Sequence, residues 1–201
     1  MLNEKQLQEY ASLRNDLLAM DLPMNKATDQ QLDQVSARVK QSLSPAIWRD
    51  LVFSKPITQE YAVIMNDPRQ DDMMILLVLW PANSGGQVHD HLTWAVIGVA
   101  RGVEENQIWH YQKRPKEKQE VLVPSYREQF HPGDVCVMQH DNIIHNVTNL
   151  APANKVSISI HVYGRDLRTT GRKTYYPDRN EALPNQNDEF ISLVKFIALS
   201  D

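Results

Sequence analysis

The sequence predicts a mainly β protein in which a closed antiparallel barrel or sandwich follows a group of α-helices. Apolar residues recur at steps of three and four over the first fifty residues, which is the spacing of one helix face. After Pro56, short runs of β-branched and aromatic residues alternate with Gly, Pro and Asn turn signals, as in antiparallel β proteins. We expect one domain, with a helical segment over 1–55, a barrel over 56–175 and a C-terminal wrap over 176–201.

Two amphipathic helices and a short third one are expected in the helical segment. The first carries the apolar stripe Leu7, Tyr10, Leu13 and Leu17. Thr28 and Gln31 have the spacing of a capping box that begins the second helix. Its stripe consists of Leu32, Val35, Val39 and Leu43. Ser44-Pro45 then places a cap and a first-turn proline before a short helix.

Turn signals separate the expected strands. The run 74–80 is apolar throughout, which indicates a strand covered on both faces. The polar tail 170–187 contains two prolines and is expected to be irregular, and 190–199 is expected to be a short helix or strand. Strands are expected at 61–65, 74–80, 94–99, 107–111, 120–123, 134–138 and 155–163.

Composition excludes several classes of protein. The 201 residues carry 21 basic and 25 acidic side chains, a net charge of −4, so no basic footprint for nucleic acid or an anionic membrane is visible. No apolar run reaches the roughly 18 residues of a membrane span, and the polar first ten residues are unlike a signal peptide. A single cysteine, Cys136, excludes an internal disulfide framework. We therefore expect a cytoplasmic protein with neither nucleic-acid nor membrane partners.

Three of the seven histidines have the spacing of metal ligands. His89 and His91 are two residues apart after a Gly-rich turn, so on a strand they would share a face, about 7 Å apart at Cα. His145 begins another expected strand, and three imidazoles on barrel strands can form one ligand set with open positions. A pair of surface histidines beside a turn is the alternative interpretation of His89 and His91. The remaining histidines outside strand 155–163 are expected to be solvent-exposed or structural: His110, His131 and His140.

The strand 155–163 alternates strictly. Its apolar face holds Val156, Ile158, Ile160 and Val162, and its polar face holds Ser157, Ser159, His161 and Tyr163. An amphipathic strand with its polar side in water would show this pattern. In a closed barrel the same polar row would line the interior, where each polar group needs a partner. The sequence leaves both interpretations open.

These segments together resemble the thiol dioxygenases, the cysteine dioxygenase-like branch of the cupin superfamily. The resemblance covers roughly residues 60–175, with helices before it as in that family. It implies a double-stranded β-helix, or jelly-roll barrel, that holds Fe(II) through His89, His91 and His145. The residues that carry it are Gly86-Gln-Val-His89-Asp-His91-Leu-Thr-Trp94, Gly98, Gly102, His145 with Asn149, and Ser159-Ile-His161-Val-Tyr163-Gly164.

Members of that family use O₂ to convert a small thiol carboxylate into its sulfinate. The resemblance implies that Ser159, His161 and Tyr163 form the catalytic hydrogen-bonded triad outside the ligand shell. It also implies a carboxylate-anchoring arginine: in proteins similar to 3-mercaptopropionate dioxygenase, this residue follows the tyrosine by nine positions, at Arg172. Arg168 is a nearby second candidate and Arg165 a weaker one. The early-strand arginine of the cysteine dioxygenases has no counterpart around Val63.

The sequence departs from related patterns in two places. The glutamate ligand of many cupins is absent from Thr93-Trp94-Ala95-Val96, which favours an all-histidine site. The cysteine that crosslinks to the tyrosine in animal cysteine dioxygenases is replaced by Val96, so Tyr163 is expected to be unmodified. The leading hypothesis is a 3-mercaptopropionate-type thiol dioxygenase. Alternatives are an L-cysteine dioxygenase, another metal-dependent cupin enzyme, or a non-catalytic cupin that senses a metal or small acid.

Overall fold

The computed structural model describes residues 3–23, 26–43, 46–49, 61–64, 66, 71–113, 120–139, 142–152 and 155–185. In this part of the chain three helices precede the strands: α1 (Glu4–Ala19), α2 (Asp29–Leu43) and the short α3 (Ala46–Arg49). The strands are β1 (Tyr61–Ile64), β2 (Met74–Trp80), β3 (Val88–His89), β4 (Ala95–Arg101), β5 (Glu104–Lys113), β6 (Glu120–Phe130), β7 (Val135–Met138), β8 (Ile144–Asn149), β9 (Ser157–Tyr163), β10 (Lys173–Tyr176) and β11 (Glu181–Pro184).

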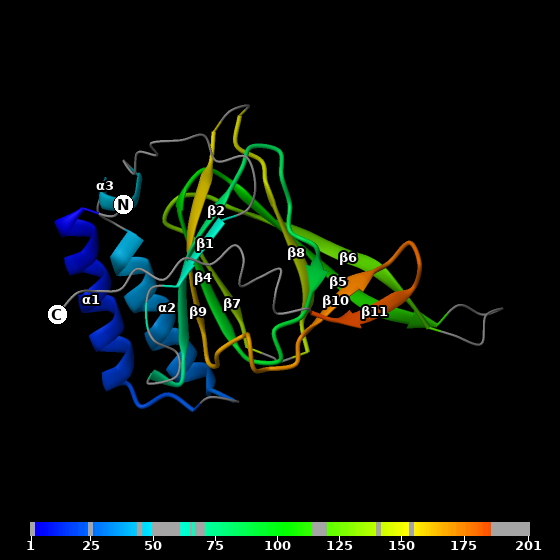
Figure 1. Ribbon diagram of the computed structural model, residues 1–201, viewed down its shortest axis with the longest axis horizontal. Helices are drawn as coiled ribbons and strands as arrows, with labels where there is room; N and C mark the ends of the chain where they lie inside the picture. Colours follow the sequence, from blue (N-terminus) through cyan, green and yellow to red (C-terminus); the bar gives the residue numbers. More distant parts are fainter. Residues whose placement is uncertain are drawn as a thin grey trace.

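The strands form two antiparallel sheets that curl around a common interior (Figure 1). The first has the order β1-β2-β9-β4-β7 and the second the order β11-β10-β3-β8-β5-β6. Strands distant in sequence are neighbours, because β9 lies between β2 and β4, and β8 lies between β3 and β5. The fold is a mainly β jelly-roll barrel with helices outside, which confirms the expected fold class.

The helices cover the outer face of the first sheet, at the left of Figure 1. Strand β2 is buried at every position, as its apolar sequence predicts, because one face packs under the helices and the other faces the barrel interior. Gly98 of β4 allows α2 to approach closely: a Cβ there would lie 2.7 Å from side-chain atoms of Val39 and Leu43.

The expected helix signals are confirmed where the structure describes them. Gln31 N donates to Thr28 Oγ1 at 3.3 Å and Thr28 N donates to Gln31 Oε1 at 3.0 Å, the two halves of the capping box before α2. Strands β5 and β6 are longer than predicted. Their outer parts are polar and exposed, so hydrogen bonding between the two strands, rather than an apolar face, extends the hairpin.

The expectation of an irregular tail over 170–187 is wrong for its central part. Lys173–Tyr176 and Glu181–Pro184 form a hairpin, and β10 also pairs with β3 beside the histidines. The prolines permit this pairing because Pro177 lies in the turn and Pro184 at a strand end on the sheet edge. The segment expected over 190–199 lies outside the described residues, so the division into 1–55, 56–175 and 176–201 stays a prediction.

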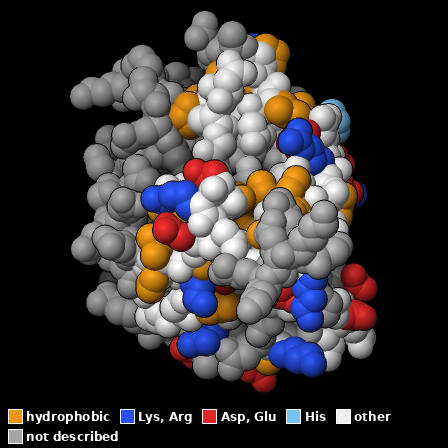
Figure 2. All heavy atoms as spheres, turned by 90° about the vertical axis from the view of Figure 1, so that its right-hand side faces the viewer, with side chains coloured by type: hydrophobic (Ala, Val, Ile, Leu, Met, Phe, Trp, Pro, Cys, Tyr) orange, Lys and Arg blue, Asp and Glu red, His pale blue; other side chains and the backbone are white. Residues whose placement is uncertain are grey.

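None of the described helices is long and apolar enough to cross a membrane. On the face shown in Figure 2, basic and acidic side chains are interspersed rather than gathered by sign.

Candidate metal centre and its cavity

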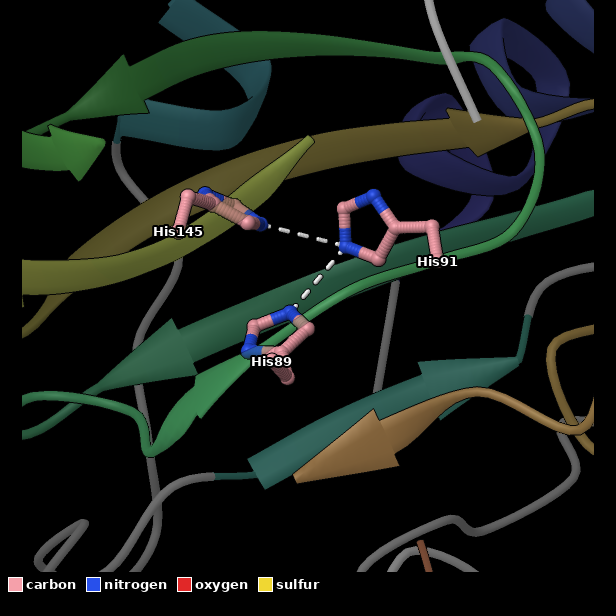
Figure 3. Close-up of side chains that lie close together, drawn as sticks. All are labelled: His89, His91 and His145. Atoms are coloured by element: carbon pink, nitrogen blue, oxygen red, sulfur yellow. Dashed lines mark hydrogen bonds between the residues drawn. The ribbon is translucent and has the colours of Figure 1, made fainter. Parts of the chain in front are cut away.

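The three candidate ligands converge from two neighbouring strands and a turn. His89 ends β3 and lies opposite His145 of β8 in the sheet register. His91 lies just beyond the end of β3, before the turn that leads to β4. Its Nε2 atom lies 3.0 Å from Nε2 of His89 and 3.2 Å from Nε2 of His145 (Figure 3). One nitrogen from each ring falls within 4.8 Å of the others, so the group could hold a metal ion.

The outer ring nitrogens of two of these histidines are held by carbonyl oxygens. His89 Nδ1 lies 2.8 Å from the Gln87 carbonyl oxygen, and His145 Nδ1 lies 2.6 Å from Asn106 Oδ1. Both partners only accept, so each Nδ1 carries the proton and each Nε2 presents a lone pair. His91 Nε2 has at most one proton to offer to its two neighbours. In at least one of the two close nitrogen–nitrogen contacts, both nitrogens therefore direct a lone pair at each other. A cation bound by both lone pairs would remove this repulsion.

The site favours neutral imidazoles. Burial, followed by the charge of Arg172, lowers the pKa of His89 to about 4. Burial also lowers the pKa of His91 and of His145 well below the usual value, with neighbouring histidines adding to the effect. All three rings are therefore neutral at pH 7, which is the form that binds a metal.

The polar face of β9 lines the barrel interior rather than meeting solvent. Ser159, His161 and Tyr163 are 0%, 3% and 4% exposed. Ser159 Oγ lies 2.8 Å from His161 Nε2, and Tyr163 Oη lies 2.8 Å from His161 Nδ1. The Tyr163 ring meets the edge of His91, with ring centroids 4.8 Å apart. The structure thus decides between the two interpretations of this strand, and the polar row reaches the candidate ligands.

A cavity of ≈240 Å³ opens beside the histidines. Its walls combine aliphatic side chains with His89, His145, His161, Tyr163 and Arg172. Arg172 is 7% exposed and is the one cationic side chain among the described lining residues. The second arginine candidate is placed differently, because the Arg168 guanidinium binds Asp166 through contacts of 2.6 and 2.8 Å and is absent from the cavity wall.

Several residues that support the site were not identified from the sequence. Asp90 accepts hydrogen bonds from Lys173 N and Tyr175 Oη, both at 2.7 Å. These contacts fix the chain between His89 and His91 against β10. The role of Asn106 becomes visible only when β5 is known to lie beside β8. No local pattern in the sequence marks these residues.

The remaining histidines and Val96 lie outside the candidate metal centre where the structure describes them. His110 and His131 are exposed, as predicted, while His140 lies outside the described residues. Val96 belongs to the core under the helices, whereas Tyr163 faces the barrel interior. A cysteine at position 96 would point to the opposite face of the sheet and could not reach the tyrosine. The assignment of the crosslink position to Val96 is therefore wrong.

Asn149, one of the motif residues, has a structural role. Its amide nitrogen donates to the carbonyl oxygens of Trp80, Pro81 and Lys155 at 2.9–3.0 Å, and its oxygen accepts from Ala151 N. It is fully buried and joins the ends of three segments.

Fold and site together define a mainly β jelly-roll protein with a three-histidine group that could hold a metal ion. No family model matches the chain. Similar solved structures include an oxalate oxidase in complex with glycolate, at 12% identity and a TM-score of 0.40, covering 56% of this chain and 59% of that one. The chain is thus matched to less than two thirds of the oxidase.

Two further similar structures cover most of their own chains. A cupin superfamily protein from Desulfitobacterium hafniense matches at 10% identity and a TM-score of 0.39, over 58% of this chain and 96% of that one. KdgF from Halomonas sp. matches at 18% identity and a TM-score of 0.38, over 59% and 90%. These values assign no activity, so a functional assignment depends on the side chains of this chain.

Proposed function

We propose that this protein is an Fe(II)-dependent thiol dioxygenase that converts a small thiol carboxylate of the 3-mercaptopropionate type into its sulfinate. The observation that carries the proposal is a cavity lined by His89, His145, His161, Tyr163 and the buried Arg172. His91 completes the group of three neutral imidazoles beside it, and Ser159 completes the hydrogen-bonded row. The assignment of Fe(II) and of a thiol comes from the sequence resemblance, and the cavity is consistent with it.

His89, His91 and His145 would hold the iron through their Nε2 atoms. Because all three ligands are neutral, the ion would keep its full double positive charge, which favours a bound thiolate. When bound, the iron supplies the redox centre at which a thiolate and O₂ meet. Three ligands leave coordination positions for both. Zn²⁺ or Ni²⁺ also binds such a set, so activity has to be measured after anaerobic loading with Fe(II).

Arg172 would bind the substrate carboxylate. A guanidinium matches a carboxylate through two parallel hydrogen bonds, and burial strengthens this pairing. The charge of Arg172 lies close enough to the histidines to lower the pKa of each of them. A short molecule with a carboxylate at one end and sulfur at the other would reach from the Arg172 guanidinium to the histidines.

The reaction balances without a further reductant. A thiol and O₂ give a sulfinate and a proton: both oxygen atoms join sulfur, which supplies all four electrons. Tyr163 would donate its hydroxyl proton in a hydrogen bond to the reacting group, while His161 fixes the position of that hydroxyl. The apolar walls, among them Leu76, Val78 and Val147, would exclude water from the sulfur. A reducing cytoplasm would keep such a thiol in its reduced form.

The cavity favours a thiol carboxylate without an amino group over L-cysteine. The described lining residues include Arg172 but no aspartate or glutamate, so an ammonium group would find no carboxylate partner there. L-cysteine would therefore bind more weakly than 3-mercaptopropionate.

Oxygen uptake tests the proposal. Protein loaded with Fe(II) under nitrogen is mixed with aerated 3-mercaptopropionate, L-cysteine or cysteamine, and O₂ consumption is followed with an electrode. We expect the highest kcat/KM for 3-mercaptopropionate. His145→Ala should abolish uptake, whereas His110→Ala, at an exposed histidine, should retain it. If iron binds but no thiol stimulates uptake, the dioxygenase proposal is wrong and a metal- or acid-binding sensor becomes the better hypothesis.

A further inference from the structure

A buried glutamate stands at the inner end of the polar row of β9. Glu104, the first residue of β5, is 3% exposed, and its carboxyl group lies near the side chains of Ser157 and Ser159, which lower its pKa against the larger opposite effect of burial. Its Oε1 atom and Ser157 Oγ are buried and have no hydrogen-bond partner among the described residues. A carboxyl group without full hydrogen bonding is costly inside a barrel, so its presence there calls for a role.

We propose that Glu104 is a positioning residue at the end of a relay, Glu104–Ser159–His161–Tyr163, and that its proton sets the direction of every hydrogen bond in that row. This inference deepens the proposed function by adding a proton source for Tyr163. The row itself does not depend on the identity of the substrate.

The direction follows from the donors and acceptors available. When Glu104 is a carboxylate, Ser159 donates to it, His161 Nε2–H donates to Ser159, and Tyr163 donates to His161 Nδ1. When Glu104 is protonated, the order reverses: Ser159 donates to Nε2, Nδ1–H donates to the Tyr163 oxygen, and the tyrosine proton points into the cavity. Burial lowers the His161 pKa to about 3, so the ring stays neutral and carries one proton in both states.

A proton can pass along the row with complete balance. Tyr163 releases its proton to the group in the cavity and receives one from His161 Nδ1. His161 Nε2 receives the Ser159 proton, and Ser159 receives the proton of Glu104. The net result is one proton moved from the Glu104 carboxyl to the cavity, with the carboxylate left behind.

Burial raises the pKa of Glu104 to about 7, and the two serine hydroxyls oppose this only in part. The groups that line the small cavity beside Glu104 come from β4, β5, β6, β7 and β8, and the titratable one among them is the Cys136 thiol. Burial raises the pKa of that thiol to about 12, so it stays neutral. This cavity has a volume of ≈10 Å³, which is at the lower limit of the space that one water molecule needs.

The tautomer of His161 reports the direction of the row. The full chain is labelled with ¹⁵N-histidine, loaded with diamagnetic Zn²⁺ and titrated from pH 5.5 to 8.5, with ring nitrogens observed by NMR. The His161 signals are identified by their loss in His161→Gln. We expect Nδ1–H at low pH and Nε2–H at high pH, with a midpoint near 7. In Glu104→Gln the pH-dependent exchange should disappear, while in Glu105→Gln, whose side chain pairs with Arg127 at 3.5 Å, it should persist.

A tautomer that stays the same across this range in the unaltered protein overturns the inference. So does an exchange that persists in Glu104→Gln. Infrared difference spectra provide a second readout, because a protonated buried carboxyl band should vanish near pH 7 in the unaltered protein and be absent from Glu104→Gln. Failure of the proposed function would appear separately, as absence of thiol-dependent oxygen uptake in a protein whose His161 still changes tautomer.

Discussion

Replacing Glu104 by glutamine should make the protein more stable at alkaline pH and change its stability little in acid. The variant Glu104→Gln keeps the shape of the side chain and removes its ionisation. Burial raises the carboxyl pKa from 4.5 to about 7 in the folded protein. Below pH 4.5 the group is protonated in both folded and unfolded chains. Between pH 4.5 and 7 the unfolded chain has lost the proton that the folded chain still holds, so the unaltered protein loses stability across this range, and the loss is complete above pH 7.

The magnitude follows from the same pKa values. At about 1.36 kcal/mol per pKa unit, the carboxyl group costs the unaltered protein about 3 kcal/mol at pH 8 and less than about 1 kcal/mol at pH 5. The variant should therefore gain about 2–3 kcal/mol relative to the unaltered protein between these two pH values. The buried histidines also titrate, but they are present in both proteins and cancel in the difference.

Urea unfolding at pH 5 and pH 8, followed by tryptophan fluorescence in the metal-free proteins, measures this difference. Glu105→Gln provides the matched control, because its carboxylate is partly exposed and paired with Arg127. A relative gain below about 0.5 kcal/mol for Glu104→Gln would contradict this prediction, since it would mean that the folded carboxyl titrates near its ordinary pKa.

Three further predictions concern binding and packing. Arg172→Lys keeps the charge but loses the paired hydrogen bonds, so KM for 3-mercaptopropionate should rise about 10- to 100-fold. KM for cysteamine, which has no carboxylate, should stay nearly constant. Equal effects on both thiols would show that Arg172 does not bind the carboxylate. Asn106→Ala leaves His145 Nδ1 without its acceptor and should weaken metal binding about 10- to 100-fold in a competition titration; unchanged affinity would show that the amide does not orient the ring. Gly98→Val should destabilise the fold by about 1–3 kcal/mol in urea unfolding, because its side chain would displace α2; an unchanged midpoint would contradict the close packing of α2 on β4.

The alternation of side chains explains which parts of the fold the sequence predicts. The fully apolar β2 and the strictly alternating β9 each determine their own faces, because successive side chains on a strand point to opposite sides. The same rule explains the error at Val96: a shift of one residue along β4 exchanges the barrel interior for the helix-covered face. Spacing alone did not decide that register.

The site divides along a similar line. The histidines and the Ser159–His161–Tyr163 row are recognisable because they are close in sequence or recur as a motif. Asn106 acts through the neighbouring strand β8, and Glu104 acts through β9 of the opposite sheet. No local pattern in the sequence marks such contacts. The sequence does not predict the hairpin of β10 and β11, because this segment is polar and contains prolines. Its pairing with β3 depends on tertiary contacts.

The proposed reaction transfers both atoms of one O₂ molecule to the substrate sulfur. The direct measurement is mass spectrometry of the product formed from 3-mercaptopropionate under ¹⁸O₂ by Fe(II)-loaded protein, with O₂ consumption recorded in parallel. We predict a sulfinate in which both oxygen atoms carry the label, with one O₂ consumed per thiol. A disulfide product, or a sulfinate with oxygen derived from water, would contradict it.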